Sequence, residues 1–147
     1  MKKLSLIVTF VAFLASLSMG TAQQPKPKQV APLKQTENDA FIVLENLPYV
    51  ENGHERQQLD LYLPKDYKTR IKPVPLVVVI HGGGWANGSK DVAKFVEWSR
   101  FFAENGYVVA TINYRLRPEF VLPTQIIDCK SAVRWLRANA KKYNIDT

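Results

Sequence analysis

Hydrophobic and polar positions alternate along residues 57–64 (QQLDLYLP), where three leucines occupy every second position. Side chains of a β-strand point alternately to its two faces, so this spacing predicts a strand with one buried face that ends at Pro64. The segment 40–50 (AFIVLENLPYV) also has the composition of a strand. The turn dipeptide Asn52-Gly53 lies between the two segments and predicts a hairpin.

Two later segments are apolar without alternation, residues 76–80 (LVVVI) and residues 107–114 (YVVATINY). A continuous apolar run of this length predicts a strand that is buried on both faces.

Two further segments carry apolar residues at helical spacing. We expect the first helix to be capped by Ser89 or Asp91 and to end in a left-handed turn at Asn105-Gly106. The second helix should start at Pro123, a favoured first helical residue, and end near residues 142–144. The positions expected to face the core are Val92, Phe95, Val96, Phe102 and Ala103 in the first helix and Ile126, Cys129, Val133, Leu136, Ala140 and Tyr143 in the second.

Strand, helix, strand and helix follow one another from residue 76 onward. This order predicts right-handed crossovers and a mostly parallel sheet with helices on both faces, which is the α/β class.

The first 22 residues have the pattern of a secretory signal peptide, with two lysines, an uncharged apolar run over residues 4–17 and small residues up to Ala22. The apolar run is shorter than the roughly 20 residues that cross a bilayer, so we expect cleavage after Ala22, export to the periplasm or medium, and no stable membrane insertion afterwards. Residues 23–39 are polar and proline-rich, which predicts a flexible lead-in before a domain at residues 40–147.

The formal net charge is +7, and two of the lysines belong to the predicted leader. The remaining basic residues are scattered among acidic ones, which disfavours nucleic-acid binding. Cys129 is the only cysteine and the chain has two histidines, so an internal disulfide is excluded and no zinc cluster or other cofactor is expected. The oligomeric state is left open.

Three glycines follow His81 directly after the apolar run 76–80 (LVVVIHGGGWANG). Glycines at the carboxyl end of a buried strand allow backbone amides to face an anion, either a phosphate or the oxyanion of an acyl-transfer intermediate. Neither phosphate-binding pattern, G-x-G-x-x-G or G-x-x-x-x-G-K-[ST], is present. H-G-G-G after a strand is instead the oxyanion motif of lipases and esterases.

From about Gln58 onward, the sequence resembles the amino-terminal half of an α/β-hydrolase of the hormone-sensitive-lipase-like or bacterial carbohydrate-esterase type. The segments that carry this resemblance are LDLYLP, PLVVVIHGGGWANGSK, FFAENGYVVATINYRL and IIDCKSAVRWLRANAKKYNID. The resemblance implies an incomplete α/β-hydrolase fold that contains the first strands of the sheet with flanking helices.

The resemblance also implies roles for the glycine motif. The amides of Gly83 and Gly84 would point into the oxyanion hole, with Trp85 as a further candidate donor. Trp85 could equally wall an acyl pocket or pack beneath the loop. His81 precedes the motif, whereas the catalytic histidine of this fold is the last triad member along the chain, so we expect His81 to support the loop.

Asp128 lies on the second predicted helix without a basic residue one helical turn away, and Arg115 lies at the end of the preceding strand. We expect these two residues to form a structural ion pair rather than to supply the acid of a triad.

No G-x-S-x-G sequence occurs in the 147 residues. The resemblance therefore places the serine, the Asp or Glu and the histidine of the triad beyond Thr147. This implies a fragment that is inactive alone, with residues 76–80 as an uncovered apolar edge.

The expected function of the complete protein is that of a secreted serine hydrolase of carboxylic esters, with a small-molecule or polysaccharide ester as substrate. The alternatives are an aryl-formamide hydrolase, for which H-G-G-x-W is also typical, and a prolyl-oligopeptidase-type peptidase. A catalytically inactive hydrolase-like binding domain is the alternative outside enzymes.

Overall fold

The computed structural model describes residues 35–37 and 39–146 of the 147-residue chain. The predicted signal peptide and most of the predicted lead-in lie outside the described residues. The strands are β1 (Gln35–Glu37), β2 (Phe41–Pro48), β3 (Gln58–Pro64), β4 (Leu76–Ile80) and β5 (Val108–Ile112). The helices are α1 (Ala93–Glu104), α2 (Thr124–Ala138) and α3 (Ala140–Tyr143).

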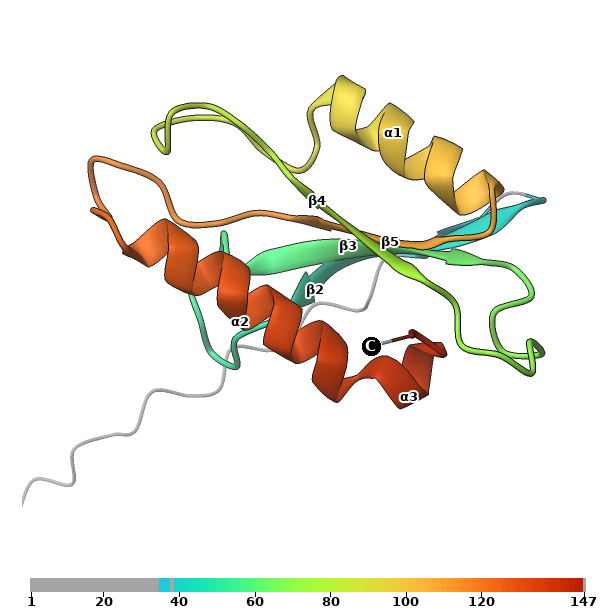
Figure 1. Cartoon of the computed structure of the whole chain (residues 1–147). Coiled ribbons are helices and arrows are strands. Elements are labelled where there is room, and N and C mark those ends of the chain that lie inside the picture. Colours follow the sequence, from blue (N-terminus) through green and yellow to red (C-terminus); the bar gives the residue numbers. More distant parts are fainter. Residues whose placement is uncertain (1–34, 38, 147) are drawn as a thin grey trace, which may run out of the picture.

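The five strands form one sheet in the order β1-β2-β3-β5-β4 (Figure 1). The pairs β1–β2, β2–β3 and β3–β5 are antiparallel, and β4–β5 is parallel. The predicted hairpin is therefore confirmed, and the crossover through α1 joins parallel strands. The described sheet is mixed rather than mostly parallel, because its first three strands form an antiparallel meander.

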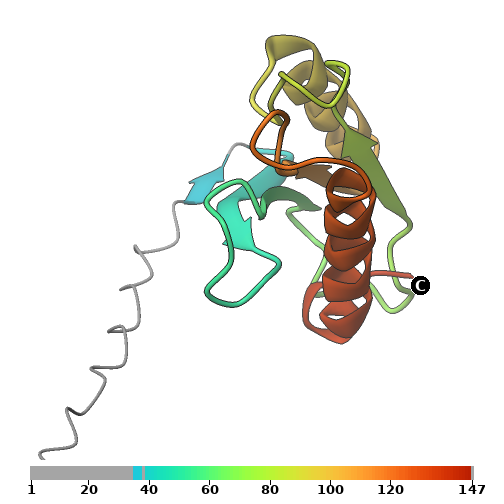
Figure 2. The ribbon, with the colours of Figure 1, turned by 90° about the vertical axis from the view of Figure 1, so that its left-hand side faces the viewer.

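Helix α1 covers one face of the sheet, and α2 and α3 cover the other (Figures 1 and 2). The larger core lies under α2 and α3 and includes Leu59, Leu61 and Leu63 of β3, all fully buried. A smaller core under α1 contains Phe41, Val43, Tyr62, Ala103 and Val109. None of the described helices is long and apolar enough to cross a membrane.

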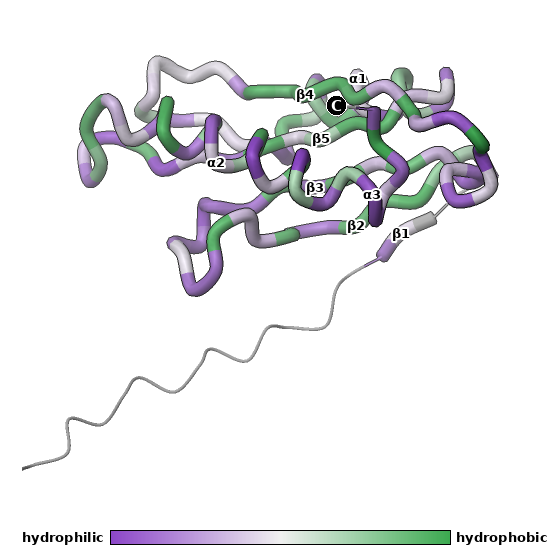
Figure 3. The backbone as a smooth tube through the Cα atoms, turned by 60° about the horizontal axis from the view of Figure 1, so that its bottom comes forward, coloured by the Kyte–Doolittle hydropathy of each residue, from purple (hydrophilic) through white to green (hydrophobic). Residues whose placement is uncertain are grey.

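Two predictions about strand burial are wrong for the described residues. Strand β3 was expected to bury one face, but α1 also covers the second face and buries Asp60 and Tyr62. Strand β4 was expected to be buried on both faces, but it is only half-buried and leaves Ile80 46% exposed. Strand β4 is the outermost strand of the described sheet, next to β5. Its hydrophobic residues, green in Figure 3, therefore lie at an edge of the sheet. Strand β5, which lies between β3 and β4, is buried along its whole length as predicted.

The buried face of α2 also differs from the predicted stripe. Gln125, Asp128, Ala132 and Leu136 are buried, whereas Ile126 is 40% exposed. Leu136 and Tyr143 were predicted correctly. The buried stripe is rotated because the polar side chains of Gln125 and Asp128 have hydrogen-bond partners inside the fold. The spacing of apolar residues does not reveal such polar contacts.

The ends of elements show smaller differences. Neither Ser89 nor Asp91 caps α1, because their side chains bond to each other and Val92 occupies the cap position. Pro123 precedes the first helical residue of α2 instead of occupying it. The left-handed turn after α1 is confirmed, with a φ of 86° at Gly106. Ordered structure also starts earlier than the expected residue 40, because β1 pairs with β2.

A buried ion pair ties the segment before α1 to the sheet. The Lys90 ammonium lies 2.8 Å from a carboxylate oxygen of Asp60, and both side chains are less than a tenth exposed. The other Asp60 oxygen accepts the amide of Asn46. Burial raises the pKa of Asp60 above its usual value even with Lys90 beside it, so desolvation outweighs the attraction between the charges.

We therefore predict that Lys90→Met lowers the free energy of unfolding by about 3–5 kcal/mol, because it leaves the Asp60 carboxylate buried without its cation. The double variant Asp60→Asn/Lys90→Met should recover most of this loss, since no buried charge remains. Chemical denaturation measures both effects, with Lys94→Met on the exposed face of α1 as the control. A double variant as unstable as Lys90→Met would contradict this reasoning.

Candidate active site

The glycine loop, residues 82–88, follows the carboxyl end of β4 and has an unusual backbone. Three consecutive residues have positive φ, with values of 127° at Gly83, 60° at Gly84 and 65° at Trp85. A Cβ atom at Gly83 would collide with the backbone carbonyl of Asn87, whereas one at Gly84 would meet open space. Glycine is thus required at Gly83 by close approach as well as by φ.

The backbone polar groups of this loop differ in their hydrogen bonding. The Gly83 carbonyl accepts the amides of Ala86 and Asn87 at 3.1 Å, which closes the turn internally. The amides of Gly83, Gly84 and Trp85 donate to no group of the described residues, and the three glycines at positions 82–84 are exposed. The loop therefore presents a set of free N–H donors at the end of a strand, which is the arrangement that binds an anion.

His81 lies at the base of the glycine loop and is 3% exposed. Its ring stacks on Tyr114 with centroids 4.2 Å apart, and its Nδ1 lies 2.8 Å from the Gly82 carbonyl oxygen. A carbonyl only accepts hydrogen bonds, so Nδ1 carries the proton. Burial lowers the pKa of His81, which keeps the ring neutral. These contacts are those of a residue that supports the loop.

Trp85 contacts the segment that follows β5. Its ring meets Tyr114 edge-on at 5.5 Å, and its carbonyl accepts the Arg117 amide at 2.8 Å. Trp85 as a whole is half-buried.

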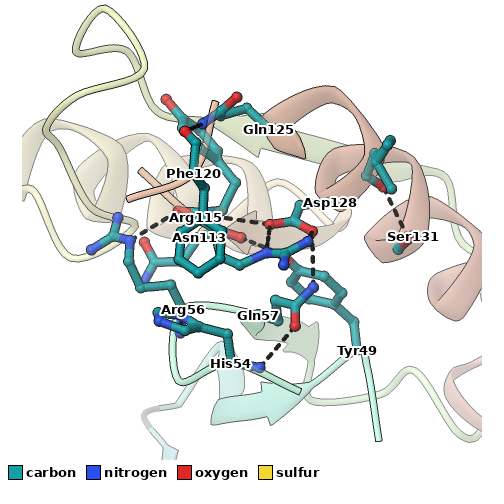
Figure 4. A network of polar contacts seen from close by, with 12 residues as sticks. Tyr49, His54, Arg56, Gln57, Asn113, Arg115, Phe120, Gln125, Asp128 and Ser131 are labelled. Carbon is teal, nitrogen blue, oxygen red and sulfur yellow. Dashed lines mark hydrogen bonds and ion pairs between the residues drawn. The ribbon is translucent and has the colours of Figure 1, made fainter. Parts of the chain in front are cut away.

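The structure brings Arg115 and Asp128 together (Figure 4). The Arg115 guanidinium donates from Nη2 to one Asp128 oxygen at 2.8 Å and from Nε to the other at 2.9 Å. The Arg115 amide and the Gln57 side chain complete the shell of the carboxylate. Burial would raise the pKa of Asp128, but these hydrogen bonds outweigh it and lower the pKa. With all its lone pairs engaged, Asp128 anchors α2 to the sheet.

Sequence reasoning missed two residues of the loop between β2 and β3. Gln57 bonds Asp128, and Arg56 donates to the carbonyl oxygens of Tyr114 and Gly88. Polar residues before a strand usually face solvent, so nothing in the local pattern singles them out. Among the described residues, no group of three or more His, Cys, Asp or Glu side chains could hold a metal ion.

Comparison with known proteins places this site in a family. The BD-FAE family model matches residues 59–147, which include all of β3 but its first residue, the glycine loop and both longer helices. The chain belongs to the BD-FAE family. The resemblance to α/β-hydrolase esterases is thereby confirmed for this part of the chain.

Relatives of this BD-FAE chain include esterases and a deacetylase. Esterase LipC of Mycobacterium tuberculosis is 38% identical over 90 residues, which are 61% of this chain and 22% of LipC. Arylacetamide deacetylase of Oryctolagus cuniculus is 33% identical over 105 residues, covering 69% of this chain and 26% of that enzyme.

Solved structures show the same fold. Esterase B of Lactobacillus rhamnosis aligns with a TM-score of 0.64 at 29% identity, over 77% of this chain and 35% of its own. A truncated carbohydrate esterase from gut microbiota aligns with a TM-score of 0.62 at 33% identity, over 77% of this chain and 39% of its own. The BD-FAE chain thus spans well under half the length of these relatives.

The buried, neutral state of His81 predicts a pH dependence of stability. A folded-state pKa below the unfolded value of 6.5 means that the stabilisation is complete above pH 6.5 and is lost as the pH falls below it. We expect the free energy of unfolding of the native protein to fall as the pH drops below about 6.5. His81→Asn should flatten this dependence, measured by denaturation at a series of pH values. Equal slopes for the native protein and His81→Asn would contradict the prediction.

Proposed function

We propose that this chain supplies the oxyanion-binding part of the active site of a serine hydrolase that acts on carboxylic esters. The observation that carries the proposal is the row of amides at Gly83, Gly84 and Trp85, which have positive φ after β4 and donate to no group of the described residues.

The chemistry needs donors of this kind. When a serine hydroxyl adds to an ester carbonyl, its proton passes to a histidine base and the carbonyl oxygen becomes an oxyanion. The amides of Gly83 and Gly84 would donate to this oxygen, with Trp85 as a third candidate. Because the negative charge develops only during the reaction, such donors stabilise the transition state more than the bound ester.

The catalytic triad is separate from the oxyanion-binding role proposed for the glycine loop. The 147 residues contain no G-x-S-x-G sequence, and Asp128 is fully engaged by Arg115 and Gln57. We propose that the serine, the acid and the histidine belong to sequence that this chain does not include, and that the chain alone is inactive.

The relatives support an ester substrate of small-molecule or polysaccharide type. They include arylacetamide deacetylase and a carbohydrate esterase, and esterase B has been crystallised with a tributyrin phosphonate inhibitor. No metal or other cofactor is part of the proposed mechanism.

Replacement of Gly83 tests the proposal in the protein as its gene encodes it. Gly83→Val should lower kcat for nitrophenyl acetate by about 10²–10³-fold with a much smaller change in KM, because the added side chain displaces an oxyanion donor. Gly82→Ala is the matched comparison, since its Cβ meets no atom within 4 Å, and it should lose far less activity.

Substrate and inhibitor measurements separate the alternatives. The native protein should cleave nitrophenyl acetate or acetyl-xylan, and a phosphonate ester should label one serine that mass spectrometry can locate. Cleavage of formylkynurenine with no ester hydrolysis would favour the formamide hydrolase, and inactivity on all three would favour a binding domain. Unchanged kcat in Gly83→Val would remove Gly83 from the mechanism.

We further propose that the protein is exported, on the basis of the leader pattern in residues 1–22. Amino-terminal sequencing of the protein from the periplasm or medium should begin at Gln23. Retention in the cytoplasm with Met1 intact would contradict this proposal.

A further inference from the structure

We propose that Arg56 is a positioning residue for the oxyanion donors, acting as a clamp that fixes the far end of the glycine loop against Tyr114. The proposal rests on the proposed function, because it assigns to Arg56 the orientation of the amides at Gly83 and Gly84.

The guanidinium of Arg56 bridges two segments that are distant in sequence. Its Nε donates to the Tyr114 carbonyl and its Nη2 donates to the Gly88 carbonyl, each at 2.8 Å. Tyr114 follows β5, and Gly88 ends the glycine loop. Arg56 extends from the loop between β2 and β3, next to Gln57 (Figure 4). The Arg56 side chain thus joins the loops that follow β2, β4 and β5.

Tyr114 also holds the near end of the glycine loop. Its hydroxyl donates to the His81 carbonyl at 2.9 Å, and its ring is fully buried against the His81 ring. The residue before the glycines and the residue that ends the loop are therefore both tied to Tyr114, the first directly and the second through Arg56.

The two ends of the loop are in close contact with each other. Gly88 has a φ of 98°, and a Cβ atom there would collide with the Gly82 carbonyl and the His81 ring. A shift of Gly88 would therefore displace the start of the loop. Since His81, Gly88, Arg56 and Tyr114 form a closed ring of contacts, the backbone between the two ends has little freedom to reorient its amides.

The geometry favours arginine over any other cation. The guanidinium is planar and offers donors in fixed directions, so it can bond two carbonyl groups at once without losing further conformational entropy. Neither carbonyl is charged, so the contact gives direction to the loop rather than a strong electrostatic attraction. Catalysis depends on such direction, because donors displaced by about 1 Å can cost about 10²-fold in rate.

The test is Arg56→Lys in the protein as its gene encodes it. The lysine retains the positive charge but lacks the planar fork, so we expect kcat for nitrophenyl acetate to fall about 10- to 100-fold while KM stays within about 3-fold. Arg70→Lys is the matched control. Arg70 likewise donates to the carbonyl of a positive-φ glycine, Gly106 at 3.1 Å, and bonds Asp66, but it lies outside the glycine loop and its contacts. Its kcat should remain at the native value.

Hydrogen exchange gives a second readout that does not depend on activity. The peptide that contains Gly82–Gly88 should exchange faster in Arg56→Lys than in the native protein, whereas peptides from β5 and α1 should be unchanged. If the native protein hydrolyses no ester, the proposed function fails and exchange alone decides whether Arg56 holds the loop. Native kcat together with native exchange in Arg56→Lys would overturn the clamp.

Arg56→Gln keeps the test decisive if Arg56→Lys does not fold. The glutamine amide offers one nitrogen in place of the two that bond the Tyr114 and Gly88 carbonyls. A fall in kcat with nearly unchanged KM and faster loop exchange would support the clamp. Native values for both would overturn it.

Discussion

The carbonyl of Gly83 accepts two backbone amides of its own turn, whereas the amides of Gly83, Gly84 and Trp85 donate to no group of the described residues. The turn needs positive φ at successive residues, which glycine adopts without a steric penalty. The same freedom makes the loop costly to order, because glycine loses more conformational entropy on folding than other residues. A loop of this kind keeps one conformation only if the surrounding structure holds it.

That support comes from polar side chains that are buried or half-buried on the sheet. Tyr114 and Arg56 hold the two ends of the loop, and Lys90 bonds Asp60 shortly after the loop ends. Gln57, the residue after Arg56, bonds Asp128. The short segment of Arg56 and Gln57 therefore contacts both the glycine loop and α2. Each of these groups loses hydration on burial, and each regains partners with fixed geometry.

The two faces of the sheet serve different purposes in this arrangement. The α2 face carries the larger hydrophobic core, which holds β3 and β5 in register. The α1 face carries a smaller core together with the charged pair of Asp60 and Lys90. The glycine loop follows β4, a half-buried edge strand, so glycines 82–84 are exposed while His81 and Tyr114, which contact the loop, are buried.

The sequence by itself determined strands β2 to β5, the two longer helices α1 and α2, and the glycine loop at the carboxyl end of β4. These features depend on local periodicity and on glycine, whose consequences act within a few residues. It also pointed to Arg115 and Asp128, because a carboxylate without a local partner needs a distant one. Only the tertiary structure decided that Arg56 and Gln57 reach the site, that both faces of β3 are buried, and that Gln125 and Asp128 rather than Ile126 face the core. These outcomes depend on which distant groups meet, and hydrogen bonds between them can bury polar residues that an apolar pattern assigns to the surface.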